Sequence, residues 1–217
     1  EIIYISLLEI YNKKNIPFLS LNCFPNENKT IFNFRVDTDF AEKKQIQKLY
    51  SLCKKFNINA SWFIETKSSE NWINTYKSMQ NQEIGLLCYR HKVFNNFRKN
   101  NLNLQKGVSI LKKNGIENLG FASPFGVWNT TLSDSINKLN FKYSSEFGLD
   151  YDNLPFFPIM NKNKFSNVLQ IPIHPICVGS LKNSKHNSEK IKKYFKNIIK
   201  NHTSNNLPIF IYDHPKQ

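Results

Sequence analysis

Short apolar segments with strand character alternate with amphipathic segments of helical period along most of this 217-residue chain. The strand-like segments are rich in β-branched and aromatic residues, whereas residues 41–56 and 97–113 repeat apolar positions with the period of a helix. The predicted strands are residues 30–40, 59–66, 83–89, 118–123, 141–147, 168–174 and 207–214. Because strands that alternate with helices pair in parallel, the pattern predicts an α/β fold, either a barrel or an open sheet.

The length of the chain fits one domain with a single sizeable core. Residues 1–29 hold a helix-like stretch, 2–11, and then turn-forming residues before the first strand. We expect residues 1–29 to be a lead-in, the end of a preceding region of a longer protein, and residues 30–217 to form the domain. No apolar run reaches the length of a membrane span and no signal peptide is seen, so the sequence leaves localisation open.

The formal net charge is +14 at pH 7, which is a charge typical of proteins that bind nucleic acid. The lysines are dispersed among asparagine and isoleucine, and no zinc-finger spacing or aromatic-glycine RNA-binding signature accompanies them. We therefore expect no nucleic-acid partner. A polyanion-binding protein stays a weaker alternative, for which binding would depend strongly on salt. The four cysteines form no CxxC pair, so buried thiols are favoured over disulfides.

Polar residues gather where the predicted strands end. Asp37 and Asp39 lie two apart at the end of the first strand, so both carboxylates fall on the same side. Two carboxylates that close are costly unless a cation or a proton lies between them. His91 and His214 follow later strands in the same way. In a (β/α) barrel this end of the strands carries the catalytic groups.

Four segments occur in an order that resembles the NodB-like polysaccharide deacetylases, carbohydrate esterase family 4. They are "RVDTD" at 35–39, "EIGLLCYRH" at 83–91, "GFASPFGVWN" at 120–129 and a last strand that ends in His214. The likeness covers the chain from Ile31 onward and is greatest for a subgroup with segments similar to "YSSEF", "YDNLPFFP" and "LQIPIHP". It implies a distorted (β/α) barrel and a divalent metal, in this family often zinc, that activates water for attack on an N-acetyl group of a sugar.

The resemblance also implies roles for individual residues. Asp37 matches the catalytic base and His214 the catalytic acid, while Asp39 and His91 match metal ligands. In the third segment Pro124 and Gly126 keep the family's loop, and the backbone N–H of Phe125 is expected to bind the oxyanion of the tetrahedral intermediate.

The chain departs from the family at two positions. Leu87 stands where the family has its first histidine ligand, and Ala122 stands where an arginine usually orients the catalytic aspartate. Arg35 or Arg90 is expected to replace that arginine. The loss at Leu87 is more serious because a site of three protein ligands falls to two.

Three hypotheses for the missing ligand stay open. In the first, another side chain replaces it: Cys88 is adjacent but points to the other face of the strand, and Glu146 and His174 lie at other strand ends. In the second, metal binds weakly and the enzyme acts slowly. In the third, the chain keeps the barrel and binds carbohydrate without hydrolysis. The main prediction is metal-dependent deacetylation of an N-acetylated polysaccharide or glycan sugar, with the third hypothesis as its alternative.

The remaining aromatic and polar candidates are less specific. Trp128 is a candidate for stacking on a sugar ring, and His174 either shapes the cleft or caps a strand, whereas Trp62 is expected in the core. Asp150 and Asp152 either contact substrate or lie in a plain turn. Two histidines in polar stretches, His186 and His202, are expected to be solvated, and Ser188 is expected to cap the helix that follows it.

Overall fold

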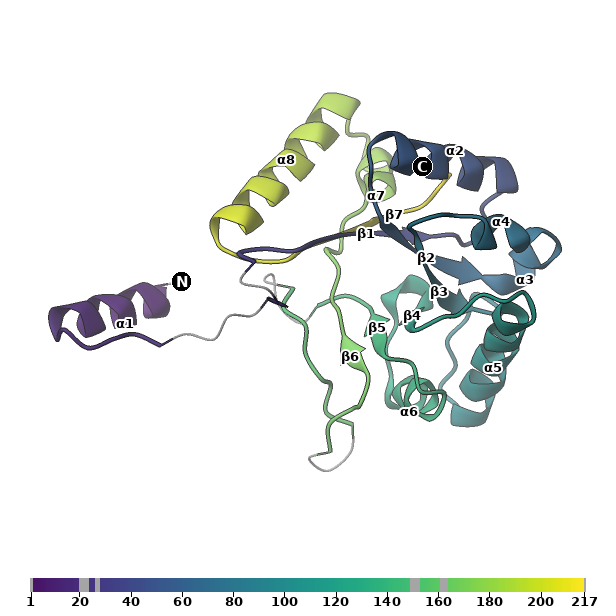
Figure 1. Ribbon diagram of the computed structural model, residues 1–217, viewed down its shortest axis with the longest axis horizontal. Coiled ribbons are helices and arrows are strands. Elements are labelled where there is room, and N and C mark those ends of the chain that lie inside the picture. Colours follow the sequence, from purple (N-terminus) through teal and green to yellow (C-terminus); the bar gives the residue numbers. More distant parts are fainter. Residues whose placement is uncertain (1, 20–23, 26–27, 149–152, 161–163, 217) are drawn as a thin grey trace.

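Seven parallel strands form one sheet in the order β6-β5-β4-β3-β2-β1-β7 (Figure 1). The structure is a computed structural model that describes residues 2–19, 24–25, 28–148, 153–160 and 164–216. The strands are β1 Phe32–Asp37, β2 Ala60–Glu65, β3 Glu83–Cys88, β4 Gly120–Ala122, β5 Tyr143–Ser145, β6 Leu169–Gln170 and β7 Ile209–Asp213. Each lies inside a segment that the sequence predicts as a strand.

The sheet curls until its two edges approach each other. Beyond β6, Ile173 forms a parallel bridge with Phe147, which extends the sheet past β5. The next residue, His174, donates its backbone N–H to the carbonyl of Phe210 on β7 at 2.7 Å. This bond joins the segment after β6 to the strand at the opposite edge. The prediction of a distorted (β/α) barrel is confirmed.

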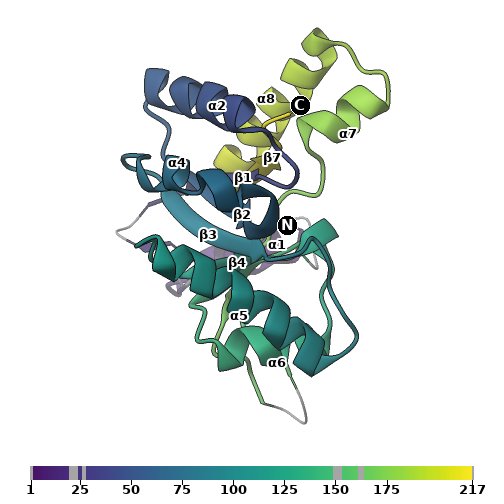
Figure 2. The ribbon, with the colours of Figure 1, turned by 90° about the vertical axis from the view of Figure 1, so that its right-hand side faces the viewer.

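Helices, with the exception of α1, lie on the outside of the curled sheet (Figure 2). The helices are α1 Ile2–Lys13, α2 Lys43–Lys55, α3 Thr66–Ser69, α4 Asn74–Lys77, α5 Phe97–Lys113, α6 Thr130–Lys138, α7 Val178–Asn183 and α8 Ser188–Ser204, with 3-10 turns η2 Glu70–Trp72 and η3 Pro124–Gly126. Helix α5 packs against β3 and α6, and α8 packs against β7. None of the helices in the described part of the chain is long and apolar enough to cross a membrane.

Helix ends follow local capping chemistry. Helix α5 matches its predicted range because the Asn96 side chain accepts a bond from the N–H of Lys99 at its start, and Gly115 takes a φ of +66° past its end. The prediction that Ser188 caps α8 is wrong, since the Asn187 side chain accepts the bond from the N–H of Lys190. Residues 70–77 do not form one continuous helix but are divided between η2 and α4.

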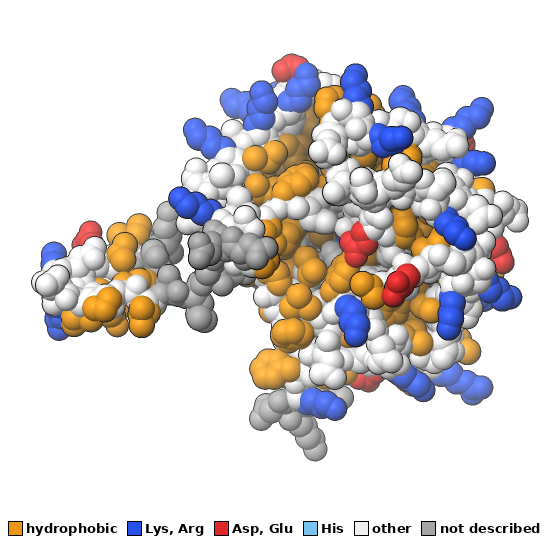
Figure 3. All heavy atoms as spheres, in the orientation of Figure 1, with side chains coloured by type: hydrophobic (Ala, Val, Ile, Leu, Met, Phe, Trp, Pro, Cys, Tyr) orange, Lys and Arg blue, Asp and Glu red, His pale blue; other side chains and the backbone are white. Residues whose placement is uncertain are grey.

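Helix α1 lies apart from the sheet (Figure 1). Several of its apolar side chains are exposed, among them Ile3, Ile5, Leu7 and Ile10, and Figure 3 shows apolar atoms on its surface. The same view shows Lys and Arg side chains at several separate places on this face. The division of the chain at residues 29 and 30 stays a prediction.

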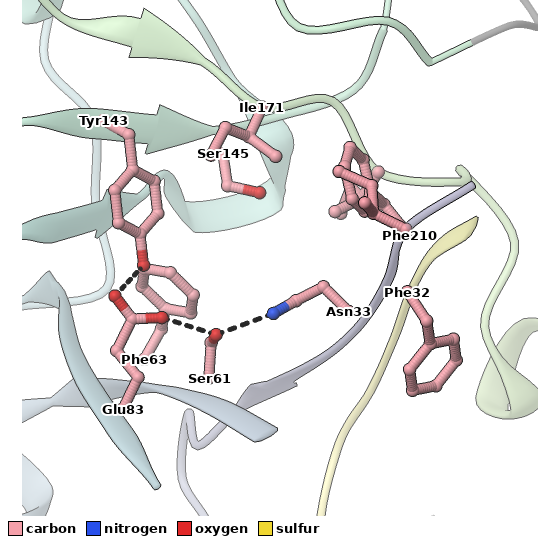
Figure 4. Close-up of a pocket in the computed structure, with 11 residues that line it drawn as sticks. Phe32, Asn33, Ser61, Phe63, Glu83, Tyr143, Ser145, Ile171 and Phe210 are labelled. Carbon is pink, nitrogen blue, oxygen red and sulfur yellow. Dashed lines mark hydrogen bonds between the residues drawn. The ribbon is translucent and has the colours of Figure 1, made fainter. Parts of the chain in front are cut away.

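At the amino-terminal end of the strands, Gly120 leaves room for the side chain of Tyr143 to pass close to β4. A Cβ at Gly120 would lie 2.2 Å from Cζ and 2.3 Å from the hydroxyl of Tyr143. The tyrosine ring thereby reaches across β4, and its hydroxyl donates to Glu83 at 2.5 Å (Figure 4). Ser61 donates to the same carboxylate at 2.6 Å and accepts a bond from Asn33. This polar chain borders a cavity of about 280 Å³.

Substitution of Gly120 with alanine is expected to destabilise the barrel. The new methyl group would overlap the Tyr143 ring, so we expect the free energy of unfolding to fall by about 1–3 kcal/mol. Urea denaturation would measure this, with Lys44→Ala on the exposed face of α2 as the control, expected within about 0.5 kcal/mol of the native chain. Equal midpoints for Gly120→Ala and the native chain would contradict the crossing described above.

Candidate active site

A second cavity, also of about 280 Å³, opens at the carboxyl ends of the strands. It brings together the four polar residues that the resemblance singles out, from β1, the loop after β1, the loop after β3 and the residue after β7. These are Asp37, Asp39, His91 and His214. The remaining lining residues are Arg35, Leu87, Phe125, Gly126, Phe147, Ile173, Tyr212 and Lys216.

Asp37 is held by a buried arginine. Arg35 Nε and one of its terminal nitrogens each donate to a different carboxylate oxygen of Asp37, both at 2.6 Å. The two residues lie two apart on β1, so their side chains share one face. Arg35 also donates to the carbonyl of Ser145 on β5. Burial opposes its charge, but Asp37, with smaller contributions from Glu146 and Tyr212, outweighs burial, and the pKa of Arg35 is raised. Arg35 therefore pairs with Asp37, whereas Arg90 is exposed.

The Arg35 guanidinium also lies over aromatic rings. Its central carbon is 5.3 Å from the ring centroid of Phe63 on β2 and 5.7 Å from that of Tyr212 on β7. Ala122, where the family's arginine would stand, is fully buried on β4. The cation that orients the aspartate thus comes from β1 in this chain.

Asp39 lies between two histidines. Its Oδ2 is 4.0 Å from Nε2 of His91, and its Oδ1 is 3.5 Å from Nε2 of His214. The His91 ring packs against the rings of Phe125 and Phe40, with centroids 4.5 and 5.3 Å away. This arrangement holds two imidazoles on opposite oxygens of one carboxylate.

The two imidazoles differ in basicity. Burial lowers the pKa of His91 more than Asp39 raises it, so this ring favours the neutral form, which offers a lone pair. Burial also opposes the charge of His214, but the neighbouring Cys177 side chain and the charge of Asp39 outweigh it and raise its pKa. His91 is suited to accept or to ligate, and His214 is suited to donate a proton.

The third ligand position is apolar. Leu87 lines the cavity and is 1% exposed, so an aliphatic side chain fills the place expected for a metal-binding histidine. None of its predicted substitutes lines the cavity in the described part of the chain: Cys88 is fully buried, Glu146 is buried and accepts a bond from Ser144, and His174 pairs with the Tyr194 hydroxyl at 2.6 Å.

Two donors for a cation therefore remain, Asp39 and His91. Zinc ligands of this type lie about 2.0–2.2 Å from the metal, which sets neighbouring donor atoms about 3.3–3.6 Å apart in a tetrahedral site. The 4.0 Å between Asp39 Oδ2 and His91 Nε2 needs only a small movement to meet this. The pair fits a cation as a two-ligand site whose other positions would be filled by water or substrate.

The loop between β4 and α6 forms one wall of the cavity. The N–H of Gly126 donates to Ser123 and that of Val127 donates to Pro124, which closes a tight turn. Phe125 has a φ of 57° inside this turn and is 76% exposed. A Cβ at Gly126 would lie 2.5 Å from the Phe147 ring. The turn thus presents the ring of Phe125 and the backbone of Gly126 to the cavity.

Some predicted site residues lie elsewhere. Trp128 and His174 are not among the described residues that line the cavity. The exposed rings of Phe125 and Phe147 line it instead. Tyr212 was not singled out, although its place two residues before His214 on one strand face gives the signal that could have found it.

The other candidates have mixed outcomes. Trp62 is fully buried and His186 is exposed, as expected. The prediction that His202 is solvated is wrong: it is buried, and its Nδ1 lies 2.6 Å from the carbonyl of Pro208 because helix α8 turns this position toward β7. Asp150 and Asp152 lie outside the described residues.

No protein-family model matches the sequence, and no curated protein matches it significantly. Solved structures do match in fold. A Mycobacterium smegmatis protein, provisionally assigned as a polysaccharide deacetylase, superposes with a TM-score of 0.72 at 14% identity, over 92% of this chain and 81% of that one. A Streptococcus pyogenes deacetylase bound to acetate gives a TM-score of 0.54 at 15% identity, over 83% and 84% of the two chains.

A third solved structure is a pseudoenzyme of carbohydrate esterase family 4 from Bacillus anthracis. Its TM-score is 0.52 at 14% identity, over 94% of this chain and 84% of that one. A mutant of that pseudoenzyme with restored enzymatic activity also matches, with a TM-score of 0.53 at 14% identity, over 93% and 80% of the two chains. The chain described here has the fold that active and inactive members of this family share.

Removal of the Arg35 cation is expected to cost far more stability than removal of a surface arginine. Arg35→Met would leave the Asp37 carboxylate buried without a partner, so we expect a loss of about 3–5 kcal/mol in the free energy of unfolding. Arg90→Met, in an exposed position, is the matched control and should stay within about 0.5 kcal/mol. Chemical denaturation of both variants would test this, and equal losses would exclude the proposed anchoring of Asp37.

Proposed function

We propose that this chain, which has the fold of the family 4 polysaccharide deacetylases, hydrolyses the acetamide group of an N-acetylated glycan. The observation that supports this most directly is the Asp37 carboxylate, held by both oxygens at a cavity that also contains Asp39, His91 and His214. A base, a proton donor and a pair of metal ligands within one cavity are the parts that amide hydrolysis needs.

In this proposal Asp37 is the general base. Two charge-assisted bonds from Arg35 keep its carboxylate oriented, so that it takes a proton from the attacking water without a change of rotamer. His214, with its raised pKa, carries the proton that the leaving amine needs. The backbone N–H of Phe125, at the turn beside the cavity, would bind the oxyanion of the tetrahedral intermediate.

Asp39 and His91 are the proposed metal ligands. A divalent cation such as zinc, when bound, would polarise the acetamide carbonyl and lower the pKa of its water. Leu87 adds no ligand, so we expect weak binding compared with a site of three protein ligands. The exposed rings of Phe125 and Phe147 would pack against the apolar face of a sugar.

A second candidate function is glycan binding without hydrolysis. The apolar side chain of Leu87 at a proposed ligand position favours glycan binding alone. Without a bound metal the site would lose its hydrolytic activity, whereas the cavity would stay intact. The fold neighbours include a pseudoenzyme and its mutant with restored activity, so one fold supports both states in that protein. The two candidates differ in whether acetate is released.

Acetate release from chitin oligosaccharides and from peptidoglycan fragments tests the main proposal. With zinc in excess the native chain is expected to release acetate, and Asp37→Asn is expected to lower the rate by about 10²–10⁴ because the general base is lost. Arg90→Met, exposed and outside the cavity, is the control for handling and folding. Oligosaccharide binding by calorimetry with no acetate release would favour the second candidate. Full activity in Asp37→Asn would remove Asp37 as the base.

Substitution of Leu87 with histidine is expected to restore the third ligand. We expect zinc affinity, measured by calorimetry, to rise by at least about tenfold and acetate release to rise with it, because one more protein ligand joins the metal. Leu87→Asn is the matched control, since it adds polarity at the same position but is a poor zinc ligand. If histidine and asparagine have the same effect on affinity, residue 87 does not face the metal.

A further inference from the structure

A second group of side chains that could bind a metal lies beside the cavity. Of its members, only His214 also lines the cavity. One donor atom each from Cys177, Asp213 and His214 lies within 4.8 Å of the other two. Within the described ranges this is the one trio of His, Cys, Asp or Glu that meets this distance. It brings sulfur, oxygen and nitrogen donors to one point.

Two elements supply these residues. Cys177 is 4% exposed and immediately precedes α7, while Asp213 ends β7 and His214 follows it. The thiol accepts a weak bond from the N–H of Ser180 at 3.4 Å and contacts the Ser180 hydroxyl at 3.3 Å. A ligand bound by all three side chains would therefore join α7 to β7.

Two atoms of the group are buried without a hydrogen bond. Oδ1 of Asp213 and Nδ1 of His214 are both inaccessible to solvent, and neither has a hydrogen-bond partner among the described residues. A buried polar atom left in this state is costly, and native structures contain few of them. A bound cation would satisfy a carboxylate oxygen and an imidazole nitrogen at once.

We propose that Cys177, Asp213 and His214 bind a zinc-type cation at a site separate from the pair Asp39 and His91. The donor set selects the class of metal, because thiolate and imidazole favour zinc and similar transition metals over magnesium or calcium. Tetrahedral zinc with these ligands sets donor atoms about 3.3–3.8 Å apart, so the group needs only a modest contraction. The fourth position falls to water.

One ring nitrogen of His214 faces the cavity, and the other belongs to the proposed cation site. Its Nε2 faces Asp39 Oδ1 at 3.5 Å, which leaves Nδ1 as the nitrogen without a partner. A cation on Nδ1 therefore does not remove the contact with Asp39. The site uses neither Leu87 nor the pair Asp39 and His91 as ligands, so its metal binding can be tested apart from deacetylation, although the two share His214.

Cobalt spectroscopy tests the site, because only a thiolate ligand gives an intense sulfur-to-cobalt charge-transfer absorption in the near ultraviolet. The full chain, freed of metal with a chelator, would be titrated with Co²⁺ and then with Zn²⁺ as competitor. We expect the charge-transfer band to saturate at one cobalt per chain and to disappear as zinc displaces cobalt. Absence of the band in the native chain would overturn the proposal.

Variants identify the ligands. Cys177→Ser is expected to abolish the band, and Asp213→Asn is expected to weaken cobalt affinity at least tenfold while the band persists at saturation. Cys53→Ala, a buried thiol on α2, is the matched control and should keep the native band. Asp39→Asn should keep it as well, which separates this site from the pair Asp39 and His91. A band that survives Cys177→Ser, or is lost in Asp39→Asn, would overturn the proposal.

Circular dichroism of each variant would establish that it is folded. If Cys177→Ser fails to fold, the Asp213→Asn titration decides the matter: unchanged cobalt affinity in that variant would overturn the proposal, and a loss of at least tenfold supports it.

Discussion

The buried ion pair of Arg35 and Asp37 is the interaction on which the rest of the site depends. The guanidinium donates to Asp37 on its own strand and to Ser145 on β5, and it lies over rings from β2 and β7. A buried cation is tolerated only when its charge and its hydrogen bonds are satisfied, so these contacts must form together. They tie four strands at the centre of the barrel and leave the Asp37 carboxylate in one orientation.

The same ion pair bears on the alanine at position 122, where the resemblance expects an arginine. Ala122 is fully buried on β4, and the place that a cation would take beside Asp37 is already filled from β1. We therefore expect Arg35 to take the orienting role that the resemblance assigns to the missing arginine. The departure at Leu87 has no such compensation among the side chains that line the cavity.

Much of the fold follows from the sequence because strand and helix periods are local signals. Helix α5 matches its predicted range, since its asparagine cap and its glycine exit are both visible in the sequence. The positions of Asp37, Asp39, His91 and His214 follow from one rule, that strand ends converge in a barrel. Contacts between residues far apart in the sequence cannot be predicted from such local signals. The burial of His202 and the approach of Cys177 to His214 depend on how α7 and α8 pack beside β7, which no local pattern encodes.

His214 belongs both to the cavity and to the proposed cation site at Cys177, so the chemistry of the two sites is coupled. If Nδ1 binds a cation, the imidazole proton must reside on Nε2, because metal ligation fixes the tautomer of the ring. Nε2 would then carry the one ring proton and, before any transfer to the leaving amine, donate it toward Oδ1 of Asp39, which leaves Oδ2 to face His91. A cation beside α7 would thus assign the two oxygens of Asp39 to different partners. On this view the cation at Cys177 would orient the proton donor and Asp39, whereas Leu87 limits how firmly a second cation binds at the cavity.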